Sequence, residues 1–305
     1  MGSPIQPQRT ALITGAASGV GFAVAKLCRS KDMHLVLLDI DRENLRKAKE
    51  TLTGMNSCLQ TEAFVIDVAD AEAWRLTSKQ ILEIFTEIDL VVLNAGKGYK
   101  PREQDVGRAN PWLDVAYWRK TLETNVYGPL NGLQYLLPML LSSRSSKSIA
   151  SPTPPGGGNP AYNASKAAVK SLTEHLAHDL RSDPKTSHIS VHLLIPGWTW
   201  TGFMGNGGPV DEGQISKPAG AWYPSQVAAE LLNGLENRTF YIICPDGETD
   251  LPLDQARMTW GGEDVLENRP ALSRWDENWA TKAAETIQAD AEARRASANR
   301  FRALK

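Results

Sequence analysis

The sequence predicts an α/β fold, in which a doubly wound, mostly parallel sheet of seven strands lies between two layers of helices. Short, almost wholly apolar runs recur along the chain, which is typical of strands buried on both faces of a parallel sheet. Segments compatible with helices alternate with these runs, as right-handed crossovers require. With 305 residues, 42% of them apolar, the chain is long enough for one large domain with a substantial core.

Each element is expected from its own local pattern. Strands are expected at the apolar runs 11–14, 35–40, 62–67, 88–96, 189–197 and 239–247. Helices are expected at 21–30, 41–53, 71–87, 114–141, 162–181 and 224–236. Such an arrangement is a Rossmann-like sheet, whose binding site lies at the carboxyl edge of its strands.

The fifth strand is predicted to be short or defective. Between the helix ending near Leu141 and the loop at Pro152, the only apolar residues are Ile149 and Ala150, whereas a buried central strand normally has four to six. Either residues 139–143 leave the preceding helix to form the strand, or residues 147–151 form a stub. A third alternative is a defect in the sheet itself.

Composition and charge exclude several classes of protein. The net charge is −2 with both signs interspersed, so no nucleic-acid partner is expected. The three cysteines are far apart and lack metal-ligand spacing, which indicates reduced thiols and no metal site. No signal peptide and no run of 18 apolar residues is found, so we expect no membrane association and a cytoplasmic location.

A glycine-rich turn links the first strand to the first helix. In TGAASGVG, Gly15, Gly19 and Gly21 permit a tight turn and let the backbone approach a pyrophosphate held by the helix N-terminus. Asp39 ends the next apolar run, where a carboxylate binds an adenosine ribose and repels a 2′-phosphate. Because Ser18 is not basic either, the sequence favours NAD. Arg42 keeps NADP open as the alternative.

Tyr162 and Lys166 are four residues apart in YNASK, so on a helix they share one face. A tyrosine has a pKa of about 10, which is too high for proton exchange at neutral pH. A nearby ammonium group stabilises the phenolate and lowers that value. The pair is therefore a candidate for acid/base chemistry, although the same spacing occurs by chance in many helices.

These motifs occur in order with Asp67-Val68, Asn94-Ala95-Gly96, Asn125 and Pro196-Gly197, and together they resemble the single-domain short-chain dehydrogenase/reductase family over about residues 8–245. The resemblance implies that Tyr162 is the general acid or base, that Lys166 binds the nicotinamide ribose, and that Asn125 holds a water linked to Lys166. It also implies that Asp67 and Val68 flank the adenine, that Asn94 to Gly96 lie beside the ribose, and that Pro196, Gly197 and Thr201 contact the carboxamide. The cofactor-binding residues predicted in all are Gly15, Ser18, Gly19, Val20, Gly21, Asp39, Asp67, Val68, Asn94, Ala95, Gly96, Tyr162, Lys166, Pro196, Gly197 and Thr201.

The family also has a serine at the end of the fifth strand, which steadies charge on the substrate oxygen. The usual spacing, thirteen residues before Tyr162, falls on Ile149, which cannot take this role. Ser146, Ser148 and Ser151 are the alternatives, and Ser146 is preferred. That preference follows a narrower resemblance, through PAYNASKAAVKSL, KPAGAW and NRPALSRW, to a fungal branch of the family with some members in secondary metabolism.

The predicted function is hydride transfer between a nicotinamide cofactor and a secondary alcohol or ketone. Because the fifth strand is weak, the alternative is a nucleotide-binding protein with impaired redox activity, acting as a scaffold or in a non-redox step. Trp198, Trp200 and Trp222 bracket a predicted lid at 198–223 and would suit a flat or hydrophobic substrate. The resemblance also implies a homo-oligomer.

Residues 1–247 are expected to form the dinucleotide-binding catalytic domain. Residues 248–305 are expected to form a largely helical extension that is not an independent domain, since 276–304 are dense in Ala, Glu and Arg. Asp114 and Glu123 are interpreted as solvated acids on the helix at 114–141.

Overall fold

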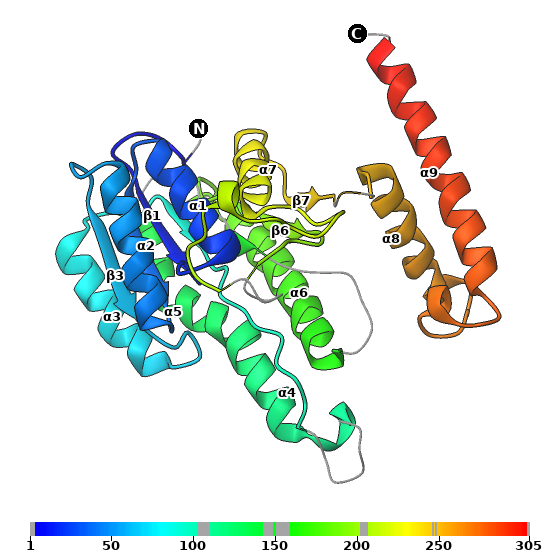
Figure 1. The fold of residues 1–305 in the computed structure, drawn as a ribbon, viewed down its shortest axis with the longest axis horizontal. Helices are drawn as coiled ribbons and strands as arrows, with labels where there is room; N and C mark the ends of the chain where they lie inside the picture. Colours follow the sequence, from blue (N-terminus) through cyan, green and yellow to red (C-terminus); the bar gives the residue numbers. More distant parts are fainter. Residues whose placement is uncertain are drawn as a thin grey trace. The chain divides into compact units, whose positions relative to one another are not determined.

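Strands and helices alternate along the first third of the chain (Figure 1). The structure is a computed structural model that describes residues 4–102, 110–142, 149–150, 159–201, 207–245, 247 and 249–303. The strands β1 (Thr10–Thr14), β2 (His34–Asp39), β3 (Thr61–Val65) and β4 (Leu90–Val92) pair in parallel in the order β3-β2-β1-β4. The helices α1 (Gly19–Ser30), α2 (Arg42–Met55) and α3 (Ala71–Ile84) connect them.

Three later strands form a second hydrogen-bonded group of the sheet. It has the order β5-β6-β7, with β5 (Ile149–Ala150), β6 (Leu193–Pro196) and β7 (Tyr241–Cys244). The parallel pairing of β5 with β6 sets Ile149 opposite Leu193, and β5 also contacts β4. The Rossmann-like α/β fold predicted from the alternating pattern is confirmed.

The described part of the fifth strand lies within the range 147–151 of the stub alternative. In the described residues β5 spans two residues, whereas α5 (Gly128–Ser142) continues as a helix to Ser142. The alternative in which residues 139–143 leave the helix is therefore wrong as far as Ser142, because those residues keep their helical conformation.

The helix predicted at 114–141 is not continuous, and this correction has a local cause. It divides into α4 (Val115–Leu122), a π-helical turn η2 (Glu123–Tyr127) and α5. Pro129 has no N–H to donate, so the regular i→i−4 ladder is interrupted near this residue. The Gly128 N–H instead bonds the Glu123 carbonyl, five residues back. The turn places Asn125, which is 1% exposed, in the interior.

The sheet packs its helices on both faces. On one face Leu12, Val36 and Val91 contact Trp74 of α3 and Leu136 of α5, all of which are buried. The Trp74 indole N–H also donates to the Val68 carbonyl at 3.0 Å, so the largest side chain of this core is satisfied. The alternate residues of β1 and β2 point to the other face, where α1 contacts α2 and α7 (Pro224–Glu236).

The chain falls into two compact units, Met1–Ile242 and Ile243–Lys305. The second unit contains α8 (Leu251–Leu266), the short η5 (Ser273–Trp275) and α9 (Ala280–Ala303). These helices enclose a small core of their own, made by Ala256, Trp260, Ala283, Ile287 and Ala291. None of the helices in the described ranges combines the length and apolarity needed to cross a bilayer.

Candidate active site

The turn between β1 and α1 has the geometry of a phosphate cradle. Gly15 and Gly19 have φ angles of +64° and +52°, which side-chain-bearing residues rarely adopt. A Cβ on Gly21 would collide with the Gly15 carbonyl oxygen, so the turn closes this tightly only with glycine. Ser18 caps α1 and its hydroxyl makes no bond to the helix. The first N–H groups of α1, including that of Val20, therefore remain available to an anion.

Asp39 lies at the carboxyl end of β2, directly beside this turn. Its Oδ2 accepts from the Ala17 N–H at 3.0 Å, and its Oδ1 accepts from the Asp41 N–H at 3.0 Å. Each carboxylate oxygen has a second lone pair for a ligand hydroxyl. The structure thus joins Asp39 and the glycine turn, as the sequence predicts.

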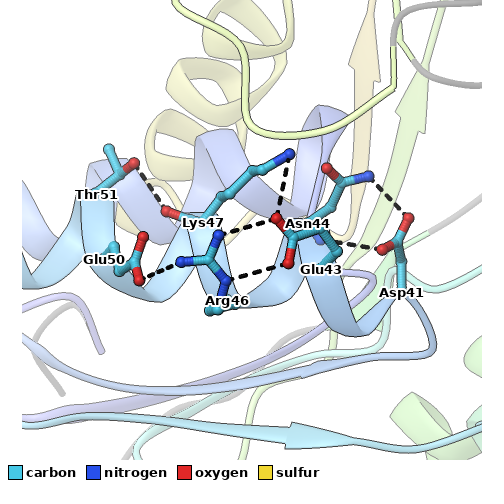
Figure 2. A network of polar contacts seen from close by, with 7 residues as sticks. All are labelled: Asp41, Glu43, Asn44, Arg46, Lys47, Glu50 and Thr51. Atoms are coloured by element: carbon cyan, nitrogen blue, oxygen red, sulfur yellow. Dashed lines mark hydrogen bonds and ion pairs between the residues drawn. The ribbon is translucent and has the colours of Figure 1, made fainter.

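The start of α2 carries charged residues, most of which pair with one another in the described part of the chain. Figure 2 shows Asp41 binding Asn44, and Arg46 held between Glu43 and Glu50. Because Arg46 is committed to two carboxylates, it is not free for a phosphate. Arg42 is exposed and has no partner among the described residues, so it alone carries the NADP alternative.

Asn94, Ala95 and Gly96 follow β4 and reach the turn from the other side. The Asn94 side-chain amide donates to the Thr14 and Gly15 carbonyls at 3.1 and 3.4 Å, and the Ala95 N–H donates to the Thr14 hydroxyl at 2.9 Å. These bonds fix the end of β4 against the cradle. Two other predicted residues lie at the end of β3, where Asp67 is exposed and Val68 is 7% exposed.

Asn125 joins the loop after β4 to the helix α6 (Pro160–Ser182). Its side-chain oxygen accepts from the Lys97 N–H at 2.8 Å, and its amide donates to the Lys97 carbonyl at 3.1 Å and to Ser165 Oγ at 2.9 Å. Ser165 in turn donates to the Tyr162 carbonyl at 2.7 Å. The side chain of Asn125 therefore bonds to the backbone of Lys97 and to the Ser165 hydroxyl. That it also holds a water linked to Lys166 stays a prediction.

Tyr162 and Lys166 share one face of α6, as their spacing predicts. The Lys166 Nζ lies 5.3 Å from the centroid of the Tyr162 ring. A Cβ on Gly96 would lie 3.4 Å from the same nitrogen, so the ammonium faces the end of β4. Burial disfavours its charged form and lowers the pKa of Lys166 to about 8.

Asn159 is a site residue that our interpretation of the sequence missed. It caps α6 by accepting from the Tyr162 N–H at 3.0 Å, accepts from the Tyr117 hydroxyl at 2.6 Å, and donates to the Tyr99 carbonyl at 3.0 Å. One side chain thus ties α6 to α4 and to the loop after β4. The signal was available, because an asparagine followed by Pro160 marks a helix start.

Asp114 corrects the interpretation as a solvated acid. It is 4% exposed, caps α4 by accepting from the Tyr117 N–H at 3.1 Å, and accepts from the Arg102 N–H at 2.9 Å. These hydrogen bonds, with the Arg102 guanidinium, lower the pKa of Asp114. The acid anchors the loop that precedes α4. Glu123, by contrast, is exposed as expected.

Thr201 also reaches the cradle, because a Cβ on Gly19 would lie 3.1 Å from its methyl group. Pro196 ends β6, and Gly197 follows it. The third hydroxyl, predicted at Ser146 with Ser148 and Ser151 as alternatives, lies outside the described residues.

Trp198, Trp200 and Trp222, which were expected to line a pocket, are joined by backbone hydrogen bonds. The Trp200 N–H donates to the Trp222 carbonyl, and the Trp222 N–H to the Trp198 carbonyl. A cavity of about 280 Å³ lies elsewhere, between α1, α7 and residues 208–215, and these tryptophans do not line it.

Comparisons with known proteins agree with this geometry. The sequence model of the family described as "short chain dehydrogenase" matches residues 9–209. "Dehydrogenase/reductase SDR family member 7B" of Xenopus laevis is 26% identical over 235 residues, covering 74% of this chain and 71% of its own. "Sulfoacetaldehyde reductase 2" of Chromohalobacter salexigens is 30% identical over 198 residues, and the match covers 63% of this chain and 73% of that protein.

A solved short-chain dehydrogenase/reductase from Burkholderia phymatum, in complex with NAD, superposes with a TM-score of 0.72. It is 26% identical, and the match covers 87% of this chain and 96% of that one. The chain therefore belongs to the short-chain dehydrogenase/reductase family and is an NAD(P)-dependent oxidoreductase.

Proposed function

We propose that the protein transfers a hydride between a nicotinamide cofactor, with NAD preferred, and a secondary alcohol or ketone. The observation that carries this proposal is the position of Lys166, partly buried against Gly96 and 5.3 Å from the centre of the Tyr162 ring. A nicotinamide ring, when bound, would donate or accept the hydride. The residues of the chain would supply the proton.

In the reducing direction Tyr162 would donate its phenolic proton to the carbonyl oxygen as the alkoxide develops. The resulting phenolate is stabilised by the Lys166 ammonium, which is mostly protonated below its pKa of about 8. Ser165 and Asn125 position the Tyr162 backbone against the loop after β4. Ser146 is proposed to donate the second hydrogen bond to the substrate oxygen.

The cradle would hold the cofactor by the N–H groups of Gly19, Val20 and Gly21 and by the Ser18 hydroxyl. Asp39 would accept the ribose hydroxyls, and its charge supports the preference for NAD. The pairing of Arg46 with Glu43 and Glu50 supports it too, because this guanidinium is not free for a 2′-phosphate (Figure 2). The solved structures similar to this chain include complexes with NAD and with NADP, which supports a nicotinamide cofactor of either kind. A role in secondary metabolism stays a prediction from the resemblance.

A Tyr162→Phe variant tests the proton-transfer role. It should bind NADH as the wild type does, by nicotinamide fluorescence, yet lose at least about 100-fold in kcat on a ketone or alcohol substrate. A matched Tyr223→Phe variant, in the lid rather than beside Lys166, should retain its kcat. Undiminished turnover by Tyr162→Phe would refute the role.

Cofactor preference has its own test. The wild type should bind NADH more tightly than NADPH, and Asp39→Asn should narrow that difference, because it removes the charge that repels a 2′-phosphate. Tighter binding of NADPH than of NADH by the wild type would contradict the preference for NAD and would indicate that Arg42 binds the 2′-phosphate.

A second candidate is a nucleotide-binding protein with impaired redox activity, and it is supported by the sequence, which has only Ile149 and Ala150 as apolar residues between Leu141 and Pro152. This candidate predicts that NADH binds while no ketone or alcohol in a broad panel is turned over. Turnover abolished by Tyr162→Phe would exclude it.

A further inference from the structure

Two exposed lysines from different segments approach one aromatic ring. The Lys97 Nζ, in the loop after β4, lies 5.6 Å from the centroid of the Tyr99 ring, and the Lys120 Nζ, in α4, lies 4.7 Å from it. Neither ammonium group has a hydrogen bond or ion pair to another described residue. Because both nitrogens lie near the same ring centroid, the distance between them is at most comparable with the Debye length, about 10 Å at 0.1 M ionic strength. An anion between them would be attracted by both charges.

This pair borders the proposed proton-transfer site. Asn125 binds both the N–H and the carbonyl of Lys97, and Asn159 binds the carbonyl of Tyr99 while capping the helix at Tyr162. The neighbouring Gly96 backbone faces the Lys166 ammonium. The backbone that carries Lys97 is thus held in place, although its side chain is exposed.

Among the residues that the structure describes, the nearby carboxylates do not pair with Lys97 or Lys120. Asp114 is buried and occupied by the Arg102 backbone at 2.9 Å and its guanidinium at 3.5 Å. Glu123, three residues after Lys120, is exposed and forms no ion pair with it in the part of the chain that the structure describes. Two like charges near one ring, with no counter-ion among the described residues, repel each other, so an anionic ligand would relieve the repulsion.

We propose that Lys97 and Lys120 bind an anionic group, a carboxylate or sulfonate, at the end of the substrate remote from the reacting carbonyl. This inference deepens the proposed function and rests on it, since it assigns the substrate class to the same site. Tyr99 positions both ammonium groups through its ring, and its hydroxyl contacts the Thr124 hydroxyl at 3.2 Å.

Direct binding tests the charge preference without any turnover. Benzoate and benzamide have nearly the same shape and differ in charge, and each is titrated into the NAD-loaded enzyme by calorimetry. The wild type should bind benzoate about tenfold more tightly, since each exposed ammonium contributes a factor of about 2 to 5. A Lys97→Gln/Lys120→Gln variant should lose most of this preference. Lys79→Gln, an exposed charge on α3, is the control and should keep it.

Kinetics separates this inference from the proposed function. The probes are the ketones 4-acetylbenzoate and its methyl ester, and the double variant should raise KM for the acid about tenfold while leaving kcat for the acid and both constants for the ester unchanged. If the wild type reduces both ketones equally well and does not prefer benzoate, the inference fails and the function stands. If it binds benzoate through the two lysines but reduces neither ketone, the anion site stands and the function fails. A loss of preference in Lys79→Gln equal to that in the double variant would also overturn the inference.

Discussion

Replacing Lys166 by methionine should make the cofactor-free protein more stable at neutral pH. Burial lowers the pKa of this side chain from 10.5 to about 8. Each tenfold change in a protonation equilibrium corresponds to about 1.4 kcal/mol, so keeping the ammonium charged in the folded state costs about 3 kcal/mol below pH 8. Because the side chain is only partly buried, solvent reduces this figure, and we expect a gain of about 2 kcal/mol for Lys166→Met at pH 7.

The same reasoning fixes the sign of the pH dependence. Between about pH 8 and 10.5 the folded protein has released the Lys166 proton while the unfolded chain still holds it. The unfolded state then binds more protons, so the stability of the wild type rises with pH across this window. Lys166→Met lacks the titrating group, and the difference between the two proteins should shrink towards pH 10.

Urea unfolding of the cofactor-free proteins at pH 7 and pH 10 measures this effect. Lys170→Met is the matched control, because Lys170 lies one turn further along α6 on its exposed side and pairs with Glu174. It should change stability by less than about 1 kcal/mol at either pH. A difference between wild type and Lys166→Met that stays constant from pH 7 to pH 10 would refute the burial argument. Such a variant would gain stability while losing activity, as expected for a strained functional group.

Substitutions at four further residues test other parts of the structure. Gly21→Ala should destabilise by about 1–3 kcal/mol in thermal unfolding and weaken NADH binding, because its Cβ has no room. Gly54→Ala, with nothing within 4 Å, should instead stabilise α2 by about 0.5–1 kcal/mol. Asn159→Ala should cost about 1–2 kcal/mol and lower kcat without changing the Kd for NADH, whereas Asn159→Asp keeps the cap and should recover most of the stability. Trp260→Phe removes the indole bond to Ser273 and should speed proteolysis within residues 249–303, and unchanged cleavage would contradict a role in that core.

The phosphate cradle was predictable because its signals are local. An apolar run, glycines at fixed spacing and Asp39 after the next run are all visible without knowing what lies across the sheet. The same holds for Tyr162 and Lys166, whose common helix face follows from their spacing. The structure brings these residues together as predicted, and their roles towards a cofactor or substrate stay predictions.

Residues that depend on distant partners were not predictable in this way. Asp114 has the sequence context of a surface acid, and its burial follows from Arg102 and Tyr117, which only the fold brings to it. Asn159 is a recognisable helix cap, but nothing local shows that its other bonds reach Tyr117 and Tyr99. The break at η2 comes from Pro129, a local cause that the apolar periodicity of the segment obscures.

The bonds around Asn159 and Asn125 also define a modular boundary. In the part of the chain that the structure describes, the hydrogen bonds of these two side chains run to α4, α6 and the loop after β4, so the proposed proton donor, Tyr162, is anchored by one group of elements. The third hydroxyl is expected from another part of the sequence, at Ser146, before β5. For an engineer, a change at the substrate-facing hydroxyl and a change at the proton donor are therefore separate designs, and a substitution at Ser146 should leave the anchoring of Tyr162 unchanged.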